Sequence, residues 1–367
     1  MSAIHSVQNQ STPFCGRNLF LIDTPLREVV VRNGAGWAAP ELETWGARLG
    51  SADIAEWARL ANQFPPQLRN FDPCGRRIDE VEFHPAWHHL MQLARAEGLH
   101  AAPWQPGAGG AQVARAAKYY LYSQAENGTQ CPLTMTFASV PVLRQQAAAL
   151  PALAQDWLPR VLSYSYDPAS SPLDAKHAAL IGMGMTEKQG GSDLRANTSF
   201  AVRTGADDWG DRYSLVGHKW FFSVPQSDAH LVLAQTRQDS ADGLSCFLMP
   251  RWRRDGSRNA IFVQRLKDKL GNRSNASAEV EFEDAEAWLV GAPGQGVRTI
   301  LEMGNHTRMD CAIASAGVMR AVLVHALHHA RERQAFGRRL SEQPLMQNLL
   351  ADLCLESESA LVLALRL

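Results

Sequence analysis

The sequence predicts an α+β protein in which a helical domain is followed by an antiparallel β-barrel or sandwich and then by a second helical domain. Three observations support this prediction. Apolar residues recur at helical spacing over the first 180 residues. Between residues 182 and 284 the chain instead shows short alternating runs of apolar and polar residues. Helical spacing returns after Gly296, and we therefore place the domains at residues 1–181, 182–287 and 288–367.

The composition is that of a folded protein without a strong overall charge. The chain has 367 residues, 46% of them hydrophobic, with 36 basic residues against 37 acidic ones. This length is sufficient to bury the cores of two or three domains. Because the charges balance, a nucleic acid or a membrane surface would require a local patch.

The spacing of the cysteines and the N-terminal sequence indicate where in the cell the protein is expected. Six widely spaced cysteines favour reduced thiols and a cytoplasmic protein. The first residues lack a basic segment followed by an apolar one, and no run of 18 apolar residues occurs. We therefore expect no signal peptide and no membrane partner.

Helices are expected where apolar residues recur at steps of three and four. The expected helices are Glu41–Phe64 with a break near Gly50, Pro85–Glu97, Ala111–Asn127, Val140–Leu150 and Leu173–Leu180 in the first domain. The pattern reaches Leu367 without a glycine cap or a proline stop, so we expect the last domain to be incomplete.

Strands are expected in the middle domain, at runs separated by Gly, Asp and Pro. These runs are N-T-S-F-A-V-R, R-Y-S-L-V-G-H-K-W-F-F-S, A-H-L-V-L-A-Q-T, L-S-C-F-L-M-P and A-E-V-E-F-E-D.

A glycine-rich loop opens this middle domain. The stretch M-T-E-K-Q-G-G-S-D begins at Met185, directly after the apolar run A-A-L-I-G-M-G-M. Backbone amides next to glycine can approach an anion or a flat ring, and the hydroxyls of Thr186 and Ser192 can donate to oxygens. Taken alone, the loop is better explained as a turn between two strands than as a cofactor site.

Two further motifs have ordinary explanations when each is taken alone. Trp220, Phe221 and Phe222 offer an apolar wall with Ser223 at its edge, but a strand facing a barrel core would look the same. The stretch R-E-R-Q-A-F-G ends a long helical pattern, and Arg333 in it could bind a pyrophosphate or simply be a solvated charge.

Together and in this order, the motifs T-E-x-x-G-G-S-D, G-x-K-W-x-x-S and R-x-R-Q-x-F-G resemble the acyl-CoA dehydrogenase flavoprotein family. Longer stretches are similar to the AidB branch of that family, which is linked to the response to DNA alkylation. These stretches are N-Q-F-P-P from Asn62, G-R-R-I-D-E-V-E-F-H-P-A-W-H from Gly75, C-P-L-T-M-T-F-A from Cys131 and L-K-D-K-L-G-N-R-S-N-A-S from Leu266. The resemblance covers essentially the whole chain.

The resemblance implies FAD as the cofactor and assigns its binding residues. The residues implied in the loop and strand are Met183, Gly184, Met185, Thr186, Glu187, Lys188, Gln189, Gly190, Gly191, Ser192, Phe221, Phe222 and Ser223. Arg333, Phe336 and Gln343 match positions that reach the FAD of a neighbouring subunit, which implies a homotetramer. No metal is implied.

The resemblance also implies α,β-dehydrogenation of an acyl-CoA thioester, for example isovaleryl-CoA. The family places its glutamate base at one of two positions. Thr307 occupies the first, and the second would lie beyond Leu367, so the catalytic base is unknown. Lys188 and Gln189 depart from the usual loop sequence, which leaves access to the thioester pocket open.

The alternative class is a protein that associates with double-stranded DNA and protects it, with FAD mainly structural. The branch is implied to bind DNA through a basic region that this chain does not contain. Within the chain, residues 251–275 carry eight basic and two acidic residues, an excess of six, as a second candidate contact. His325, His328 and His329 share a helix and are expected to form a surface or interface cluster rather than a metal site.

Overall fold

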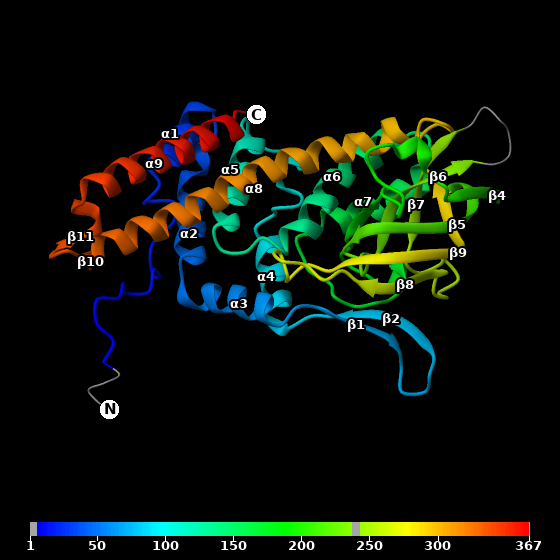
Figure 1. Ribbon diagram of the computed structural model, residues 1–367. Coiled ribbons are helices and arrows are strands. Elements are labelled where there is room, and N and C mark those ends of the chain that lie inside the picture. Colours follow the sequence, from blue (N-terminus) through cyan, green and yellow to red (C-terminus); the bar gives the residue numbers. More distant parts are fainter. Residues whose placement is uncertain (1–5, 237–242, 367) are drawn as a thin grey trace. The chain divides into compact units, whose positions relative to one another are not determined.

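The computed structural model describes residues 6–236 and 243–366 (Figure 1). The chain divides into two compact units. The first unit combines the chain up to Glu56 with Pro106–Asn127 and the chain from Met309 onward. The second unit combines Trp57–Gln105 with Gly128–Arg308. The N-terminal part of the chain therefore contributes helices to both units.

The first unit is built from helices. It contains α1 (Thr24–Arg32), α2 (Ala39–Leu49), α5 (Ala111–Ser123), the last part of α8 (Gly296–Glu332), the short hairpin of β10 (Gln334–Ala335) and β11 (Arg338–Arg339), and α9 (Pro344–Ala364). Helix α3 (Ala52–Gln63) runs from this unit into the second. The break predicted near Gly50 is confirmed as the join between α2 and α3.

Buried charged pairs tie these helices together. Arg115 on α5 donates from Nη2 to Oδ2 of Asp310 on α8 at 2.8 Å, and its Nη1 reaches the other carboxylate oxygen. Asp23 caps α1 by accepting from the Leu26 amide at 3.2 Å, and also accepts from the Tyr120 hydroxyl at 3.0 Å. Truncating one partner of such a pair would leave a buried charge uncompensated.

The second unit contains α4 (Pro85–Ala96), α6 (Gln130–Gln146), α7 (Pro151–Leu162), the end of α3 and the first part of α8, with a hairpin of β1 (Gln67–Phe71) and β2 (Arg77–Glu82). The hairpin corrects the expectation that the first 181 residues are entirely helical. The expected helix at 173–180 is also wrong, because only Leu173–Ala175 forms a single 3-10 turn. Beyond it, the amides of Ala179 and Leu180 donate to the Arg160 carbonyl and the Asp228 carboxylate, which replaces helical hydrogen bonding.

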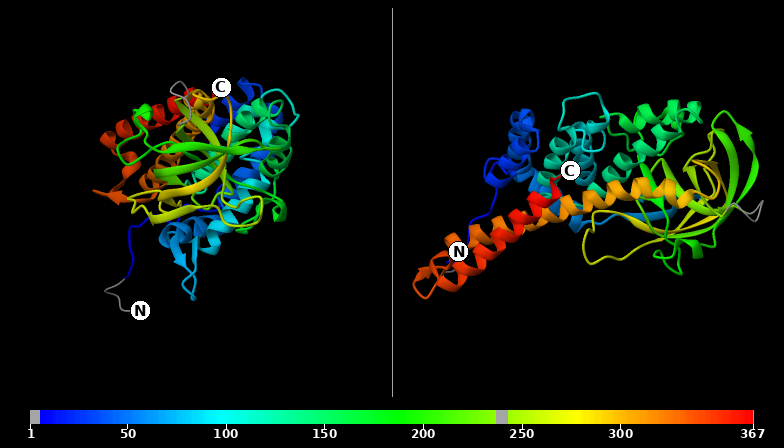
Figure 2. Two further views of the ribbon diagram at one scale, coloured as in Figure 1. Left: turned by 90° about the vertical axis from the view of Figure 1, so that its right-hand side faces the viewer. Right: turned by 90° about the horizontal axis from the view of Figure 1, so that it is seen from above.

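The middle of the chain forms a β-barrel (Figure 2). Its strands are β3 (Ile181–Gly184), β4 (Phe200–Asp207), β5 (Gly210–Ser223), β6 (Ala229–Thr236), β7 (Leu244–Pro250), β8 (Ile261–Leu266) and β9 (Ser277–Leu289). The order β3-β6-β4-β5-β9-β7 closes through pairing of β7 with β6, and β8 adds to β9. The predicted barrel is confirmed, but it is mixed rather than antiparallel, since β3 and β4 each run parallel to β6.

Two apolar cores explain this arrangement. The barrel interior is filled by buried side chains such as Phe222, Phe247 and Phe282. A second core lies between the barrel and α6 and α7, and contains Trp157 and Trp288. Strands β6 and β7 are buried along most of their length, which is why their sequences read as continuous apolar runs.

Helix α8 is long and apolar enough to cross a membrane by length and composition. A single helix of this kind is weak evidence for a span, because the core helices of soluble bundles have the same length and composition.

Candidate functional site

The loop predicted to bind the cofactor leaves the C-terminal end of β3 and lies against the end of β5. The Trp220 amide donates to the Thr186 carbonyl at 2.8 Å, and the Lys188 amide donates to Nε2 of His218 at 3.0 Å. A small β-bridge between Glu187 and Gly190 closes the tip of the loop. Residues 183–192 and 218–223 are therefore brought together, as predicted.

Glu187 holds this loop in place from inside. Its side chain is fully buried, and Oε1 accepts from Nζ of Lys219 on β5 at 2.5 Å. The other oxygen accepts from the Thr198 amide at 2.7 Å and the Gln189 amide group at 2.8 Å. Because both carboxylate oxygens already accept hydrogen bonds from the protein, Glu187 acts as an anchor of the loop rather than as a direct cofactor ligand.

Both members of this pair have shifted pKa values. Burial by itself would raise the pKa of Glu187, but the charge and hydrogen bond of Lys219 and the backbone donors lower it to about 2. Burial lowers the pKa of Lys219 to about 8, and Glu187 offsets part of that lowering. Both groups are charged at neutral pH.

The glycines of G-M-G-M and G-G-S-D have two separate roles. A Cβ on Gly184 would lie 2.6 Å from the Phe222 ring, and one on Gly182 would collide with the His230 ring. These two glycines therefore allow β3 to pack on buried aromatic rings. In the loop, Gly190 has a φ of +148° and open space around the position of a Cβ, and its N–H donates to the Glu187 carbonyl at 3.0 Å.

A bulge in β5 separates the aromatic residues. Lys219 pairs with Val280 and Phe222 pairs with Ala278, so Trp220 and Phe221 together face one residue of β9. Phe221 has a φ of +50° and is 53% exposed, whereas Phe222 is fully buried and stacks on His230 at 4.0 Å between ring centroids. The Phe222 ring fills the barrel core and is not presented at this surface, so the predicted contact of Phe222 with the flavin would have to be made by its backbone.

Several donors at this surface are available to a ligand. Among the described residues, the hydroxyls of Thr186 and Ser192 have no hydrogen-bond partner. Lys267 places its ammonium 4.0 Å from the centroid of the Phe221 ring. Ser223 is half-buried and its hydroxyl lies 3.2 Å from that of Ser277. Two hydroxyls without a partner in the protein, one half-buried and one exposed, fit together with the exposed ring a flat cofactor with carbonyl and phosphate oxygens.

Sequence reasoning missed Lys219 as the partner of Glu187. A signal was present, since a lysine at an inward position of an alternating strand requires a buried anion. The departures at Lys188 and Gln189 have local contacts. Lys188 lies over the Trp220 ring with its Nζ 5.8 Å from the centroid, and Gln189 donates to the Ala196 carbonyl at 3.1 Å.

Arg333, Phe336 and Gln343 lie in the first unit, around the β10–β11 hairpin. Phe336 is fully exposed at the tip with a φ of +52°, and Gln343 donates to the Ala335 carbonyl at 3.1 Å. Arg333 donates to the Asn9 carbonyl. The hairpin therefore presents an aromatic ring to its surroundings, as a contact with another molecule requires.

Thr307 lies on α8, where its hydroxyl donates to the Gly304 carbonyl at 3.0 Å. It is a helix-face residue with no acid–base role visible in its contacts. The catalytic base remains unassigned within the described part of the chain.

The basic stretch at 251–275 does not form one positive surface. Arg251 is half-buried and donates to the Asp79 carbonyl at 2.9 Å, and desolvation lowers its pKa to about 10. Arg254 is paired with Asp208, and Arg265 with Glu279 at 2.7 Å. Three of the eight basic residues, Arg254, Arg258 and Arg265, are therefore paired with acidic side chains.

The histidines of α8 pack against the N-terminal segment. Phe14 lies 5.0 Å from His325 and 5.3 Å from His328 between ring centroids, and His329 hydrogen-bonds with Ser11 at 3.1 Å. Among the described residues, no group of three or more His, Cys, Asp or Glu side chains is placed to hold a metal ion.

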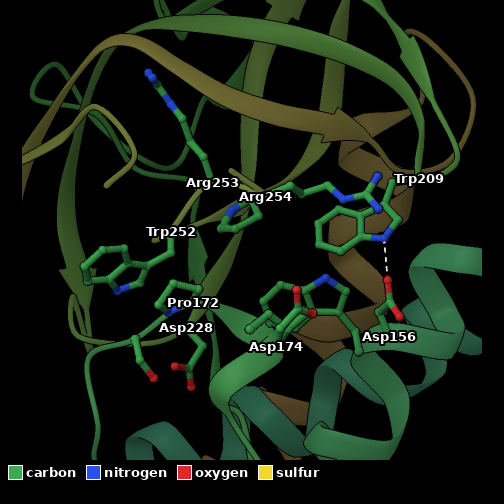
Figure 3. Close-up of a pocket in the computed structure, with 12 residues that line it drawn as sticks. Asp156, Pro172, Asp174, Trp209, Asp228, Trp252, Arg253 and Arg254 are labelled. Carbon is green, nitrogen blue, oxygen red and sulfur yellow. Dashed lines mark hydrogen bonds between the residues drawn. The ribbon is translucent and has the colours of Figure 1, made fainter. Parts of the chain in front are cut away.

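Two polar cavities of the second unit lie away from the flavin loop. One has a volume of about 120 Å³ and is bordered by Asp156, Asp174, Trp209 and Trp252, with Arg253 and Arg254 above it (Figure 3). The other, of about 300 Å³, lies beside Asp228, which lines both. Neither is lined by residues 183–192.

Comparisons with known proteins agree with this fold and this loop. The acyl-CoA dehydrogenase middle domain matches residues 182–285, and the C-terminal domain of the same family matches residues 294–367. The chain belongs to the acyl-CoA dehydrogenase family. Residues 9–168 match the N-terminal domain of adaptive response protein AidB, which places the chain in the AidB branch.

Individual relatives give the same assignment. The chain is 52% identical to AidB of Escherichia coli (strain K12) over 99% of its own length and 65% of that protein. The crystal structure of Caenorhabditis elegans ACDH-11 in complex with C11-CoA has a TM-score of 0.88 at 28% identity, over 98% of this chain and 61% of that one. The apo-form of Bd2924 also has a TM-score of 0.88, at 31% identity over 97% and 70% of the two chains.

Members of this family are FAD-dependent flavoproteins. The residues described above fit that cofactor, with Thr186, Gly190, Gly191 and Ser192 on the loop and Trp220 and Phe221 on the bulge. When bound, FAD supplies a hydride acceptor.

Proposed function

We propose that the protein is an FAD-dependent acyl-CoA dehydrogenase of the AidB type, which oxidises the bond between the α and β carbons of an acyl-CoA thioester. One observation carries the proposal: the buried Glu187–Lys219 pair fixes a glycine-rich loop next to an exposed aromatic bulge. The chain spans about 65% of its Escherichia coli relative, so the activity of the whole protein is part of the proposal.

The residues of the chain would bind and orient the cofactor. The hydroxyls of Thr186 and Ser192 would donate to its oxygens, while Trp220 and Phe221 would cover an edge or face of the ring. The Glu187–Lys219 pair keeps these donors in position and takes no part in the reaction.

The substrate is proposed to be an acyl-CoA. The structure of ACDH-11 holds C11-CoA, which supports the thioester class. A short branched substrate such as isovaleryl-CoA is our specific proposal, and a chain of eleven carbons is the comparison to test beside it.

An anaerobic titration of the FAD-loaded protein tests turnover. We expect isovaleryl-CoA to bleach the flavin absorbance in proportion to substrate added, with the eleven-carbon acyl-CoA measured in parallel. Bleaching only by the longer substrate would contradict the short-chain proposal. An unchanged spectrum with both would contradict the dehydrogenase proposal and leave a flavoprotein with a structural cofactor.

A role in the response to DNA alkylation is the second candidate, favoured by the match of residues 9–168 to the adaptive response protein. The pairing of Arg254 and Arg265 with acidic residues argues against residues 251–275 as the DNA contact. A gel-shift titration with duplex DNA at two salt concentrations tests binding. If binding is seen, we expect Lys267→Gln with Arg273→Gln to leave it unchanged, and a large loss would restore this stretch to the proposal.

A homotetramer is proposed as the assembly. Exposed apolar residues on the first unit support association of several chains.

A further inference from the structure

The β10–β11 hairpin of the first unit is too short to hold its shape by itself. Two residue pairs join its strands. At its tip, Phe336 and Gly337 have φ values of +52° and +75°, the pattern of a two-residue hairpin turn of type I′. A phenylalanine is unfavourable at positive φ, and an isolated two-stranded hairpin is only marginally stable in water. The hairpin therefore requires contacts with the rest of the chain.

Asn9, in the N-terminal segment, supplies such a contact. Its Nδ2 donates to the Gln334 carbonyl at 2.9 Å, and its Oδ1 accepts from the Gln334 amide at 2.8 Å. A carboxamide has the donor and the acceptor of a peptide group, so the Asn9 side chain pairs with β10 as a residue of a neighbouring strand would. The carbonyl of Asn9 also accepts from the Arg333 guanidinium. One residue therefore holds both the backbone of β10 and the arginine that precedes it.

The N-terminal segment is in turn fixed to the last two turns of α8. The Thr12 amide donates to Oε2 of Glu332 at 2.6 Å, and the Thr12 hydroxyl donates to Oε1 at 2.9 Å. Nε2 of His328 donates to the Thr12 carbonyl at 2.8 Å. Because the first residues of a chain are poorly ordered unless they are tied down, these contacts give Asn9 a fixed base.

The chain that follows the hairpin holds it as well. Gln343 donates to the Ala335 carbonyl at 3.1 Å, and the Arg339 amide donates to Oε2 of Glu342 at 3.1 Å. Between these anchors, Phe336 is fully exposed. An exposed ring on a fixed backbone is pre-organised for binding, because less conformational freedom is lost when a partner covers it.

We propose that Asn9 is a positioning residue: it fixes the β10–β11 hairpin so that Arg333 and Phe336 are presented in one arrangement to the FAD of a second copy of the chain. The presentation to FAD rests on the proposed function and assembly. The fixing of the hairpin rests on the contacts of Asn9 alone.

Hydrogen exchange measured by mass spectrometry tests the fixing of the hairpin. Asn9→Gly removes the carboxamide and still allows the φ of +53° that Asn9 has. We expect the amides of residues 334–339 to exchange about tenfold faster, because a pair of hydrogen bonds is lost. Gln10→Gly is the matched control, since it adds the same backbone freedom and the Gln10 side chain has no hydrogen bond among the described residues. It should exchange as the unmodified protein does.

Fluorescence titration with FAD tests the consequence for the cofactor. Asn9→Gly should raise the dissociation constant of FAD about fivefold. Arg333→Gln together with Phe336→Asn removes the presented groups and keeps the turn, because asparagine accepts a positive φ. If Asn9 acts through the hairpin, adding Asn9→Gly to this double variant should raise the dissociation constant less than about twofold further. Independent effects would multiply.

Several outcomes would overturn the proposal. These are unchanged exchange in Asn9→Gly, faster exchange without a loss of FAD affinity, and effects that multiply in the triple variant. If the unmodified protein does not bind FAD, the proposed function fails together with the presentation to FAD, and hydrogen exchange still decides whether Asn9 fixes the hairpin. If Asn9→Gly does not fold, judged by circular dichroism, Thr12→Val decides. It removes a hydroxyl donor to Glu332 and should raise exchange about threefold.

Discussion

At the scale of single residues, the candidate site depends on one buried ion pair. Glu187 and Lys219 are both inaccessible to solvent, and Glu187 also accepts from the backbone of Thr198 and Ser199. Desolvating two charges is costly, so the geometry must be well satisfied for the pair to persist. Its role is to connect the loop to β5, and changes at the pair should affect both stability and cofactor binding.

Replacement of Glu187 by Gln should therefore be strongly destabilising. The change leaves Lys219 buried without its partner, and we expect a loss of about 3–5 kcal/mol in the free energy of unfolding. Urea unfolding followed by circular dichroism measures this, with FAD affinity measured in parallel. Glu283→Gln, at an exposed position on β9, is the control and should change the free energy by less than about 0.5 kcal/mol.

The same carboxylate predicts an acid dependence of stability. Its pKa is about 2 in the folded protein against 4.5 for an unperturbed glutamate, so the unfolded chain binds the proton more readily. The stabilisation is therefore present above pH 4.5 and is lost as pH falls from about 4.5 to 2, by about 3 kcal/mol. The difference in unfolding free energy between the unmodified protein and Glu187→Gln should shrink over this range. A constant difference would refute this assignment.

At the scale of elements, the bulge in β5 decides which aromatic ring faces outward. Two residues of β5 oppose one residue of β9, which shifts the alternation and leaves Phe221 exposed while Phe222 enters the barrel. Adjacent phenylalanines that look equivalent in sequence thus have different surroundings.

Alanine substitutions at Phe221 and Phe222 should have different effects on stability and on FAD binding, because the two rings have different surroundings. Phe222→Ala opens a cavity in the barrel core and should cost about 3–5 kcal/mol of unfolding free energy. Phe221→Ala removes an exposed ring and should cost less than about 1 kcal/mol, while weakening FAD binding about tenfold. Thermal unfolding and fluorescence titration with FAD measure the two effects. Equal stability losses would contradict the assigned bulge.

At the scale of the whole molecule, the first unit exposes many large apolar side chains. They lie on the last part of α8, the β10–β11 hairpin and α9, at Val318, Met319, Val322, Phe336, Leu345, Leu349, Leu353, Leu355 and Leu363. Such a concentration is typical of surfaces that are covered in an assembly.

We expect the purified chain to associate, with the tetramer as the proposed end state. Light scattering coupled to size-exclusion chromatography should give a mass well above the 40.4 kDa of one chain. Val322→Glu together with Leu353→Glu should shift the protein toward the monomer, because each buries a charge in the contact. Arg27→Glu, outside this apolar surface on α1, is the control. A monomer at all concentrations for the unmodified chain would contradict the proposal.

Much of the architecture could be predicted from the sequence. Helical spacing located α2, α3, α4 and α5, and alternating runs located β4, β5, β6, β7 and β9. These signals are local, because one buried face imposes its own period on the residues. The hairpin of β1 and β2 and the strands β3 and β8 were missed, since short strands without clear alternation resemble loops in sequence. Helices α1 and α7 were also missed, and the helix expected at Val140–Leu150 is instead α6, which spans Gln130–Gln146.

The sequence by itself determined the family, the order of helical and β segments, and the loop from Met185 to Ser192. It could do so because motif residues and their spacing are properties of the chain alone. Only the tertiary structure showed that Glu187 is an internal anchor, that the Phe222 ring is in the core and that three arginines of the basic stretch are paired with acidic residues. Each of these depends on which distant side chain is a neighbour, such as Lys219 for Glu187 or Asp208 for Arg254. The burial of these side chains and their ion pairs arise only when distant strands come together in the barrel. No local pattern in the sequence predicts them.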